Sequence, residues 1–480
     1  MSKKKCNANG IYFTGYAAND VTGSQYFVKF EDHSYLLECG LHQSSKNSYL
    51  DSYKINSEKF KFNPKDLDYV FVAHAHIDHC GLIPRLVKEG FHGKIIATRE
   101  TAMIMKPLLF NSCFIIQEEA KILSKKYKRD YKPIYSFDDV ERTLSLIEIY
   151  EEYNKIYRLN ENISFQWLHN SHCIGAAQLQ LILGQNGNTR KILYTSDIGA
   201  LHSDNHYVTD TEIPNSYNDV VIMESTYGSN KRKRYKSRKF DVEHFKAAIN
   251  TVLERGGSVI LPCFSFSRTQ ELLTTLYELY SDDPDFKTDV IVDSQLSCEI
   301  SELYNKLLFD DNLKYWNKVY EWDNVRFISD KEDSKHCLAD SSPKIIISSS
   351  GFCTNGRIIN YLKKYLRDDN SMIIFSGYIG DNPSYLSYRI KKFKKHKTIS
   401  IFKEDIPNRA DCISLTTFSS HANYDDLITY GSSVNTNKLV LVHGSPESKK
   451  NLAEGLREAI YKKNKTFRVI NSFKGMAIHL

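Results

Sequence analysis

Three histidines and one aspartate lie within six residues of one another in the stretch FVAHAHIDHCG, residues 71–81. The run that precedes them is apolar, so we expect a strand that ends where the histidines begin. Side chains two residues apart on an extended chain point the same way, so His74 and His76 can bind one ion. Asp78 and His79 then fall on the turn that opens the next helix, where they can bind a second ion. This segment therefore predicts ligands for two metal ions.

Three distant residues supply what such a two-metal centre still lacks. His172 follows the strand-like run ISFQWLH, Asp197 ends ILYTSD, and His443 ends KLVLVH. Loops beyond strand ends often carry the functional side chains of α/β proteins, although each of these residues taken alone is more often structural. One aspartate can bridge two cations. The predicted ligands are His74, His76, His172 and Asp197 for one metal, and Asp78, His79, Asp197 and His443 for the other.

The ligand types indicate which metal and which chemistry to expect. Mixed imidazole and carboxylate ligands favour zinc, with manganese next. Two divalent ions about 3.5 to 4 Å apart can hold a hydroxide between them and bind a phosphate or carbonyl oxygen. The predicted cofactors are thus two divalent metal ions, and the predicted reaction is hydrolysis.

The elements that must position these residues follow from the hydrophobic pattern. In the first 200 residues, alternation predicts strands, and a spacing of three and four predicts helices. The predicted strands are 26–30, 34–40, 68–74, 94–98, 163–169, 176–183 and 191–197, and the predicted helices are 82–90 and much of 100–155, including 137–153. After residue 228, helices and strands alternate, which predicts a parallel α/β sheet.

Composition limits the class of protein. The 480 residues are 41% hydrophobic, contain no run of 18 apolar residues and start without the apolar segment of a signal peptide, so we expect a globular cytoplasmic protein that does not bind a membrane. The ten cysteines include no CxxC pair, which favours reduced thiols. Basic clusters lie at 125–129, 231–239 and 389–397. They are expected to be either binding sites for a polyanion or solvated helix faces, with equal weight.

The HxHxDH segment with its distant His, Asp and His resembles the signature of the metallo-β-lactamase superfamily. The segments MESTYG, LPCFSFSRTQELL, VDSQLS, SSSGFCTNGR, FSSHANYDDL and LVHGSPE resemble, in order, the motifs of its β-CASP group of nucleic-acid-processing nucleases. The resemblance implies an α/β fold in which a metallo-β-lactamase αββα sandwich is interrupted by a β-CASP domain with a parallel sheet. The implied boundaries are 1–228 and 411–480 for the sandwich and 229–410 for the β-CASP domain.

The resemblance also implies a function. The chain looks like the compact stand-alone prokaryotic type, and it is expected to be a ribonuclease that hydrolyses single-stranded RNA through a two-metal-activated hydroxide and leaves 5′-phosphate products. The implied catalytic residues are Asp78, Asp197, Glu224 and His421. His421 would contact the scissile phosphate or protonate the leaving oxygen, and Glu224 would steady it; imidazole suits this role because it titrates near neutral pH.

Aromatic residues in the second half of the chain are candidates for stacking on bases. They are Tyr235, Phe264 and Phe266, and core packing is the favoured alternative for the two phenylalanines.

Three positions depart from the family pattern. Glu38 stands where aspartate is usual, at a position expected to orient a ligand histidine. Asn423 also replaces an aspartate, which puts the support of His421 in doubt, and Gln295 replaces a proline, which should change only a turn. All seven metal ligands are retained, so we expect activity.

Three alternatives remain open on the sequence. One is a DNA-directed nuclease of the same fold, and another is a metallo-hydrolase of a small ester or lactam. A third is a silent scaffold subunit, although such relatives lose metal ligands. The sequence also leaves open whether the chain forms a homodimer and whether it cuts internally or from the 5′ end.

Overall fold

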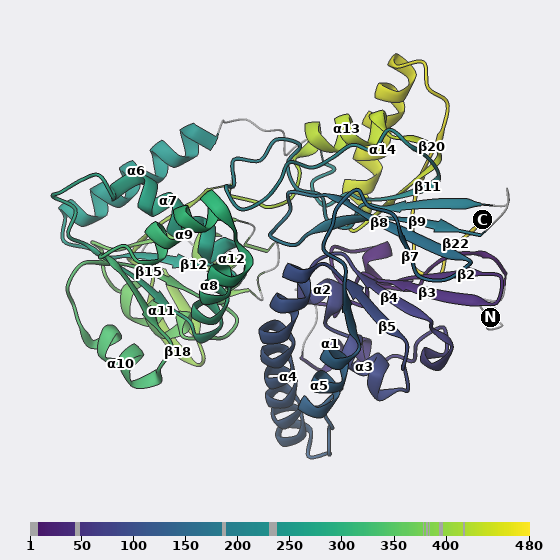
Figure 1. Cartoon of the computed structure of the whole chain (residues 1–480). Coiled ribbons are helices and arrows are strands. Elements are labelled where there is room, and N and C mark those ends of the chain that lie inside the picture. Colours follow the sequence, from purple (N-terminus) through teal and green to yellow (C-terminus); the bar gives the residue numbers. More distant parts are fainter. Residues whose placement is uncertain are drawn as a thin grey trace. The chain divides into compact units, whose positions relative to one another are not determined.

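The fold is described from a computed structural model (Figure 1). The described residues are 8–43, 49–184, 189–229, 238–377, 379–380, 383, 385–392, 397–415 and 418–480. They form two units: the first contains those up to 229 and from 420 onward, and the second contains those from 238 to 419. Among the described residues, every helix is too short or too polar to span a bilayer.

The described part of the first unit contains two seven-stranded sheets. The order in the first sheet is β22 (Ala477–His479), β1 (Gly10–Phe13), β2 (Tyr26–Phe30), β3 (His33–Leu37), β4 (Tyr69–Val72), β5 (Lys94–Ala97) and β6 (Ile147–Ile149). The order in the second is β21 (Arg468–Asn471), β20 (Asn435–Val442), β11 (Tyr217–Glu224), β10 (Arg190–Tyr194), β9 (Ala177–Leu183), β8 (Ile163–His169) and β7 (Tyr157–Arg158).

The strand directions of the second sheet determine where the loops after its strands lie. Strands β10, β11 and β20 are parallel neighbours. Strand β8 runs in the same direction as β10, because both are antiparallel to β9. The carboxyl ends of β8, β10, β11 and β20 therefore lie along one edge of the sheet.

The main core of this unit lies between the two sheets. Phe71 from the first sheet meets Phe165 from the second with ring centroids 5.4 Å apart, and Trp167 packs beside them. Full burial of one such ring stabilises the fold by about 1.5–3 kcal/mol. Two apolar faces of alternating residues thus hold the sheets together.

Helices cover the outer faces of both sheets. The second sheet packs Val221 and Leu439 against Leu427 of α13 (Tyr424–Ser433) and Leu456 of α14 (Pro446–Lys462). Beside the first sheet lie α1 (Tyr49–Asn56), α3 (Ile83–Lys88), α4 (Arg99–Tyr127) and α5 (Phe137–Ser145), as Figure 1 shows. The short elements η1 (Tyr16–Ala18), η2 (Pro64–Asp66) and α2 (Ile77–Cys80) complete the unit. The predicted αββα sandwich is confirmed.

The predicted helix over 137–153 is wrong in its second half. The helix α5 ends at Ser145, and Ile147–Ile149 form strand β6, which pairs with β5. The β-branched residues Ile147 and Ile149 favour a strand once the edge of β5 offers hydrogen-bond partners. Tertiary pairing therefore overrides the helical spacing of this segment.

The described part of the second unit contains a six-stranded sheet whose neighbours are all parallel. Its order is β14 (Val325–Ile328), β13 (Asp289–Asp293), β15 (Lys344–Ser348), β12 (Val259–Pro262), β16 (Met372–Phe375) and β19 (Asp411–Ser414), and a separate hairpin joins β17 (Thr398–Ile401) to β18 (Glu404–Pro407). The predicted parallel α/β sheet is confirmed. The pairing of β19 with β16 makes residues 411–414 the edge strand of this sheet.

Helices surround this second sheet. They are α6 (Arg238–Glu254), α7 (Arg268–Tyr280), α8 (Gln295–Leu307), α9 (Asp310–Tyr320), α10 (Lys331–Ala339), α11 (Ile358–Tyr365) and α12 (Leu386–Lys392). On one face, Ile260 and Ile346 of the sheet pack with Leu362 of α11 and Ile390 of α12. Most of the basic cluster at 231–239, and Tyr235 with it, lies outside the described residues.

Candidate metal centre

All seven predicted ligands lie in the first unit, in segments that follow strand ends. Strand β4 ends at Val72, so His74 and His76 come just after it, and Asp78 and His79 lie in α2. The other three, His172, Asp197 and His443, follow β8, β10 and β20. Because these strands run in one direction, their following loops meet at one edge of the second sheet.

The first cluster consists of His74, His76 and His172. Their ligand nitrogens all lie within 4.8 Å of one another. The Nε2 of His172 is 3.2 Å from the Nδ1 of His76. The Oδ2 of Asp197 lies 3.7 Å from His74 Nε2 and 3.8 Å from His172 Nε2. The four side chains predicted for the first metal are therefore together.

The second cluster consists of Asp78, His79, Asp197 and His443, again within 4.8 Å. The Nε2 of His79 is 3.3 Å from Asp197 Oδ2, and the Nε2 of His443 is 3.4 Å from Asp78 Oδ2. The Oδ1 of Asp197 lies 3.2 Å from His443 Nδ1. Asp197 thus reaches both clusters, as a bridging carboxylate must.

The donor atoms fit cations better than they fit one another. His74 Nε2, His79 Nε2 and Asp197 Oδ1 are buried and make no hydrogen bond within the described structure. Leaving a buried polar atom unsatisfied costs about 1–3 kcal/mol. Imidazole lone pairs and carboxylate oxygens that converge in this way are the donor set of a divalent metal site. We infer that the residues present fit two divalent ions.

The expected protonation states of four ligands favour the same conclusion, whereas that of His79 does not: burial alone would lower the pKa of His79, but Asp197 and Asp78 raise it well above its usual value. Burial lowers the pKa of His74 and of His172 well below the usual value, and it lowers the pKa of His76 to about 4. Burial alone would raise the pKa of Asp197, but His443 and His79 beside it hold that pKa well below the usual range. Neutral imidazoles and an ionised carboxylate are the forms that bind metals.

Glu38 lies on the Nδ1 side of the ligand histidines His74 and His79. This buried carboxylate accepts hydrogen bonds at Oε1 from the Ala73 N–H, at 3.0 Å, and from the Ser196 hydroxyl, at 3.3 Å. The Ser196 Oγ is also 3.0 Å from His74 Nδ1. The Oε1 of Glu38 lies 3.7 Å from His79 Nδ1. Glu38 therefore lies beside His79 and reaches His74 through Ser196.

His421, which is partly exposed, and the buried Glu224 form a pair beside the two clusters. Glu224 is the last residue of β11, and its Oε1 is 3.0 Å from His421 Nδ1 and accepts the Ile198 N–H at 2.7 Å. The His421 ring lies 4.7 Å from the ring of His172. Burial alone would lower the pKa of His421, but the Glu224 carboxylate raises it to about 10. His421 can therefore carry a proton near the clusters.

Two of the three sequence departures are explained by helix ends. Asn423 is the N-cap of α13, where its Oδ1 accepts the N–H groups of Asp425 at 2.9 Å and Asp426 at 3.1 Å. Asparagine and aspartate cap helices about equally well, so this departure preserves the cap. Gln295 is the first residue of α8, a position where proline is also common.

Phe264 and Phe266, for which the sequence predicted the same burial, differ in their exposure. Phe266 is 3% exposed and lies in the core, as expected. Phe264 is 47% exposed, so the expectation that it packs in the core is wrong.

Sequence reasoning missed two hydroxyl residues that touch the ligands. Ser196 contacts His74, and the Thr226 Oγ1 lies 3.0 Å from His443 Nδ1. The only signal in the sequence is position: Ser196 directly precedes Asp197, and Thr226 comes two residues after Glu224. Partner hydroxyls of this kind fix ring orientation and are found only once the fold brings them into contact.

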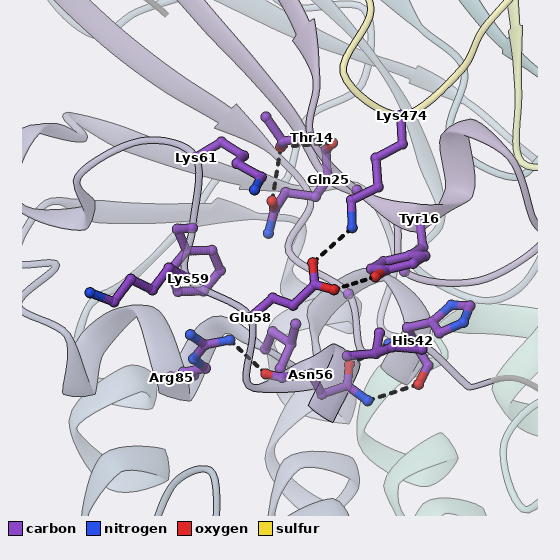
Figure 2. Close-up of a pocket in the computed structure, with 16 residues that line it drawn as sticks. Thr14, Tyr16, Gln25, His42, Asn56, Glu58, Lys59, Lys61, Arg85 and Lys474 are labelled. Carbon is purple, nitrogen blue, oxygen red and sulfur yellow. Dashed lines mark hydrogen bonds and ion pairs between the residues drawn. The ribbon is translucent and has the colours of Figure 1, made fainter. Parts of the chain in front are cut away.

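A pocket lies behind the loop that carries Asp78. Figure 2 shows the Glu58 carboxylate between Tyr16, whose hydroxyl donates to it at 2.7 Å, and Lys474, whose Nζ donates at 3.0 Å. The described residues that line this pocket include none of the seven predicted ligands. Gly40 also lines it, and a Cβ there would lie 1.6 Å from the Asp78 carbonyl oxygen. The pocket wall therefore supports the metal-binding loop rather than forming the reaction site.

The chain matches three protein-family models. Residues 18–144 match the metallo-beta-lactamase superfamily, and residues 269–382 match the Beta-Casp domain. Residues 405–467 match the Zn-dependent metallo-hydrolase RNA specificity domain. The matched stretches include the HxHxDH segment, strands β13, β14, β15 and β16 of the second unit and the region of His421 and His443.

Three proteins with similar sequences carry ribonuclease names. Ribonuclease TTHA0252 of Thermus thermophilus is 28% identical over 437 residues, which cover 90% of this chain and 92% of that protein. An RNase J-like protein of Methanocaldococcus jannaschii is 29% identical over 410 residues, 85% of this chain and 86% of the relative. Endoribonuclease YSH1 of Candida glabrata is 23% identical over 93% of this chain and 56% of its own length.

One solved structure supports the fold. A protein of unknown function from Enterococcus faecalis superposes with a TM-score of 0.53 at 15% identity, covering 98% of this chain and all of that one. At this identity the likeness concerns the fold alone.

Proposed function

We propose that this chain, which belongs to the metallo-β-lactamase superfamily and carries Beta-Casp and RNA specificity domains, is a metal-dependent ribonuclease that hydrolyses RNA phosphodiester bonds. The observation that carries the proposal is the pair of ligand clusters that share Asp197. The ribonuclease names of the similar proteins point to RNA as the substrate.

The two clusters would hold the metal ions. His74, His76 and His172 would bind one ion, Asp78, His79 and His443 would bind the other, and Asp197 would bridge them. We propose zinc, with manganese as the alternative, because imidazoles outnumber carboxylates among the ligands. When bound, such ions make water a better nucleophile and neutralise charge on the phosphate oxygens.

The side chains around the clusters would control proton movement and orientation. Glu224 accepts a hydrogen bond from His421 Nδ1 and so fixes the ring, which leaves Nε2 for the substrate. Attack of water on phosphorus breaks the bond to the 3′ oxygen of the upstream nucleotide, and His421 would give that oxygen its proton. The phosphate then stays on the 5′ oxygen of the downstream product. Glu38 would hold His74 and His79 in place throughout.

The proposal is tested with end-labelled single-stranded RNA and purified protein in Zn²⁺ or Mn²⁺. We expect shorter RNA products whose 5′ ends carry a phosphate that a phosphatase removes. The His76→Ala and His421→Ala variants, both folded by circular dichroism, should leave the RNA intact. The product sizes also distinguish internal cutting from removal of nucleotides at the 5′ end.

Two results would replace this proposal with another. If RNA stays intact with either metal while an ester or lactam is hydrolysed, the chain is a small-molecule hydrolase. If single-stranded DNA is cut faster than RNA of the same sequence, it is a DNA-directed nuclease. Three other expectations stay predictions: the domain boundaries after residues 228 and 410, a cytoplasmic location, and a homodimer.

A further inference from the structure

Phe264 exposes a large apolar ring directly beyond a fully buried strand. Strand β12 ends at Pro262, Cys263 after it is 2% exposed, and Phe264 is 47% exposed. A single exposed phenyl ring is common on protein surfaces and indicates nothing alone. The rings around Phe264 distinguish this one.

Phe264 belongs to a group of three rings, Phe264, Phe352 and Tyr385, which we call the aromatic array. The Phe264 and Phe352 centroids are 5.2 Å apart with the rings at 86°, and Phe352 stacks on Tyr385 at 4.7 Å and 9°. Gly351 lets the Phe264 ring lie against the backbone, because a Cβ there would come within 3.2 Å of ring atoms. Three separate segments thus build one apolar surface that is partly open to solvent.

The aromatic array stands where parallel sheets usually hold ligands. Phe264 follows the carboxyl end of β12, and Phe352 follows the carboxyl end of β15, which is the neighbouring strand. The chain continues from β12 to β13 on one side of the pair and from β15 to β16 on the other. Adjacent strands whose connections leave in opposite directions are where open α/β sheets bind ligands, beyond their carboxyl ends.

The neighbouring charges and polar groups select the occupant. Tyr385 immediately precedes α12, whose last turn carries Arg389, Lys391 and Lys392; Arg389 donates to the Ser400 carbonyl at 2.8 Å, and the two lysines add positive charge to the same helix. The loop after β15 exposes the polar residues Thr354 and Asn355. Aromatic rings on a surface that also carries cations are a means by which proteins bind single-stranded nucleic acid without regard to sequence.

We propose that the aromatic array in the second unit is a base-stacking site, with the Phe264 ring receiving an unpaired base of the RNA strand. The inference rests on the proposed function and deepens it, because it names a residue far from the metal ligands in the sequence that holds the substrate. Phe264 would be a binding residue and not a catalytic one. Its loss would therefore raise the dissociation constant and KM, and leave kcat nearly unchanged.

The test measures binding of fluorescent single-stranded RNA to the full chain by anisotropy. The His76→Ala background keeps the RNA intact. We expect Phe264→Ala to weaken binding roughly tenfold, the loss typical of removing one base-stacking ring. Phe264→Trp should retain binding because it keeps a flat aromatic face. The matched control is Phe402→Ala, which removes a 68% exposed phenylalanine between β17 and β18 and should change nothing.

An abasic RNA of the same length separates stacking from charge. It keeps every phosphate, so Phe264→Ala should bind it as the parent does. The salt dependence of RNA binding should also be unchanged, because phenylalanine neutralises no phosphate. Equal binding of ordinary RNA by parent and Phe264→Ala overturns the inference, and so does an equal loss on abasic RNA.

The inference and the proposed function can fail separately. If the parent chain cleaves RNA while Phe264→Ala leaves both KM and the dissociation constant unchanged, only the inference fails. If no RNA is cleaved with any metal but Phe264→Ala still weakens base-dependent binding, only the proposed activity fails. If the chain binds neither RNA nor single-stranded DNA, the base-stacking site does not exist.

Discussion

The Glu224 Oε1 lies 3.0 Å from His421 Nδ1, although 197 residues separate the two in sequence. Glu224 ends β11, and it is held by the N–H groups of Ile198 and Thr226 as well as by His421. The carboxylate therefore has a fixed position, and the histidine takes its orientation from it. This contact predicts how substitution of either residue changes the cleavage rate and its pH dependence.

We expect His421→Ala to lower kcat by a factor of about 10² to 10⁴, the usual contribution of a positioned acid or base. Glu224→Gln should have a smaller effect near pH 6 and a larger one at higher pH. The Glu224 carboxylate raises the pKa of His421 to about 10, so in the parent this ring stays protonated across the neutral range. Without that charge, the pKa of His421 should fall towards its ordinary value of about 6.5.

The sign of the pH effect follows from the proposed role of the proton. An acid is lost as the pH rises through its pKa, so the alkaline side of the pH–rate profile should move to lower pH in Glu224→Gln. Rates measured from pH 5.5 to 9.5 with each variant check this. An unchanged profile would show that His421 does not donate the proton.

The first ligand cluster predicts a change in metal content. His76→Ala should lose the ion held by His74, His76 and His172 and retain the other, because Asp78, His79 and His443 are intact. Metal analysis of dialysed protein by mass spectrometry measures this. The matched control is His202→Ala, since the His202 side chain is 95% exposed and its ring pairs with Asp210 at 3.0 Å. Equal metal content in the two variants would contradict the assignment.

Metal removal should destabilise the chain. An ion that binds only the folded state, present at 100 times its dissociation constant, adds about 2.7 kcal/mol to the unfolding free energy. Chelation should therefore lower the Tm, and Zn²⁺ or Mn²⁺ should restore it. Mg²⁺ should restore little, because it prefers oxygen ligands and the clusters are rich in histidine. Scanning calorimetry on one preparation, with each metal added in turn, gives the comparison.

The departure at Glu38 can be tested by shortening the side chain. Glu38→Asp should lose one or both contacts with the Ala73 N–H and the Ser196 hydroxyl, since the carboxylate retreats by one methylene. Loss of such a supporting contact weakens metal affinity by about 10- to 100-fold. Competition with a chromogenic chelator measures the affinity. Glu141→Asp, on the exposed side of α5, is the control and should bind metal like the parent.

At Asn423, unlike at Glu38, a change to the usual aspartate is expected to have no effect. Asn423→Ala removes the cap of α13 and should lower the free energy of unfolding by about 1 kcal/mol. Asn423→Asp retains the cap, so stability and RNA cleavage should both match the parent. Urea titrations and the RNA assay check this. A loss of cleavage in Asn423→Asp, at unchanged stability, would mean that this position acts on His421 directly.

Much of the candidate site could be predicted from the sequence because its ligands repeat a local pattern. His74 and His76 come just after an apolar strand, and side chains two residues apart on an extended chain point the same way. The strands of the second unit are likewise short apolar runs between helices, which is how a buried parallel sheet reads. The local spacing of residues was enough to predict these ligands and strands.

The tertiary structure alone decided which distant groups meet. Asp197 reaches both clusters because β8, β10 and β20 run in the same direction, and Ser196 links Glu38 to His74 for the same reason. The edge of β5 turned a helical pattern at 147–149 into a strand. Two similar phenylalanines took opposite places, with Phe266 buried and Phe264 exposed. Composition and periodicity describe one segment at a time, whereas these outcomes depend on what the rest of the chain brings alongside it.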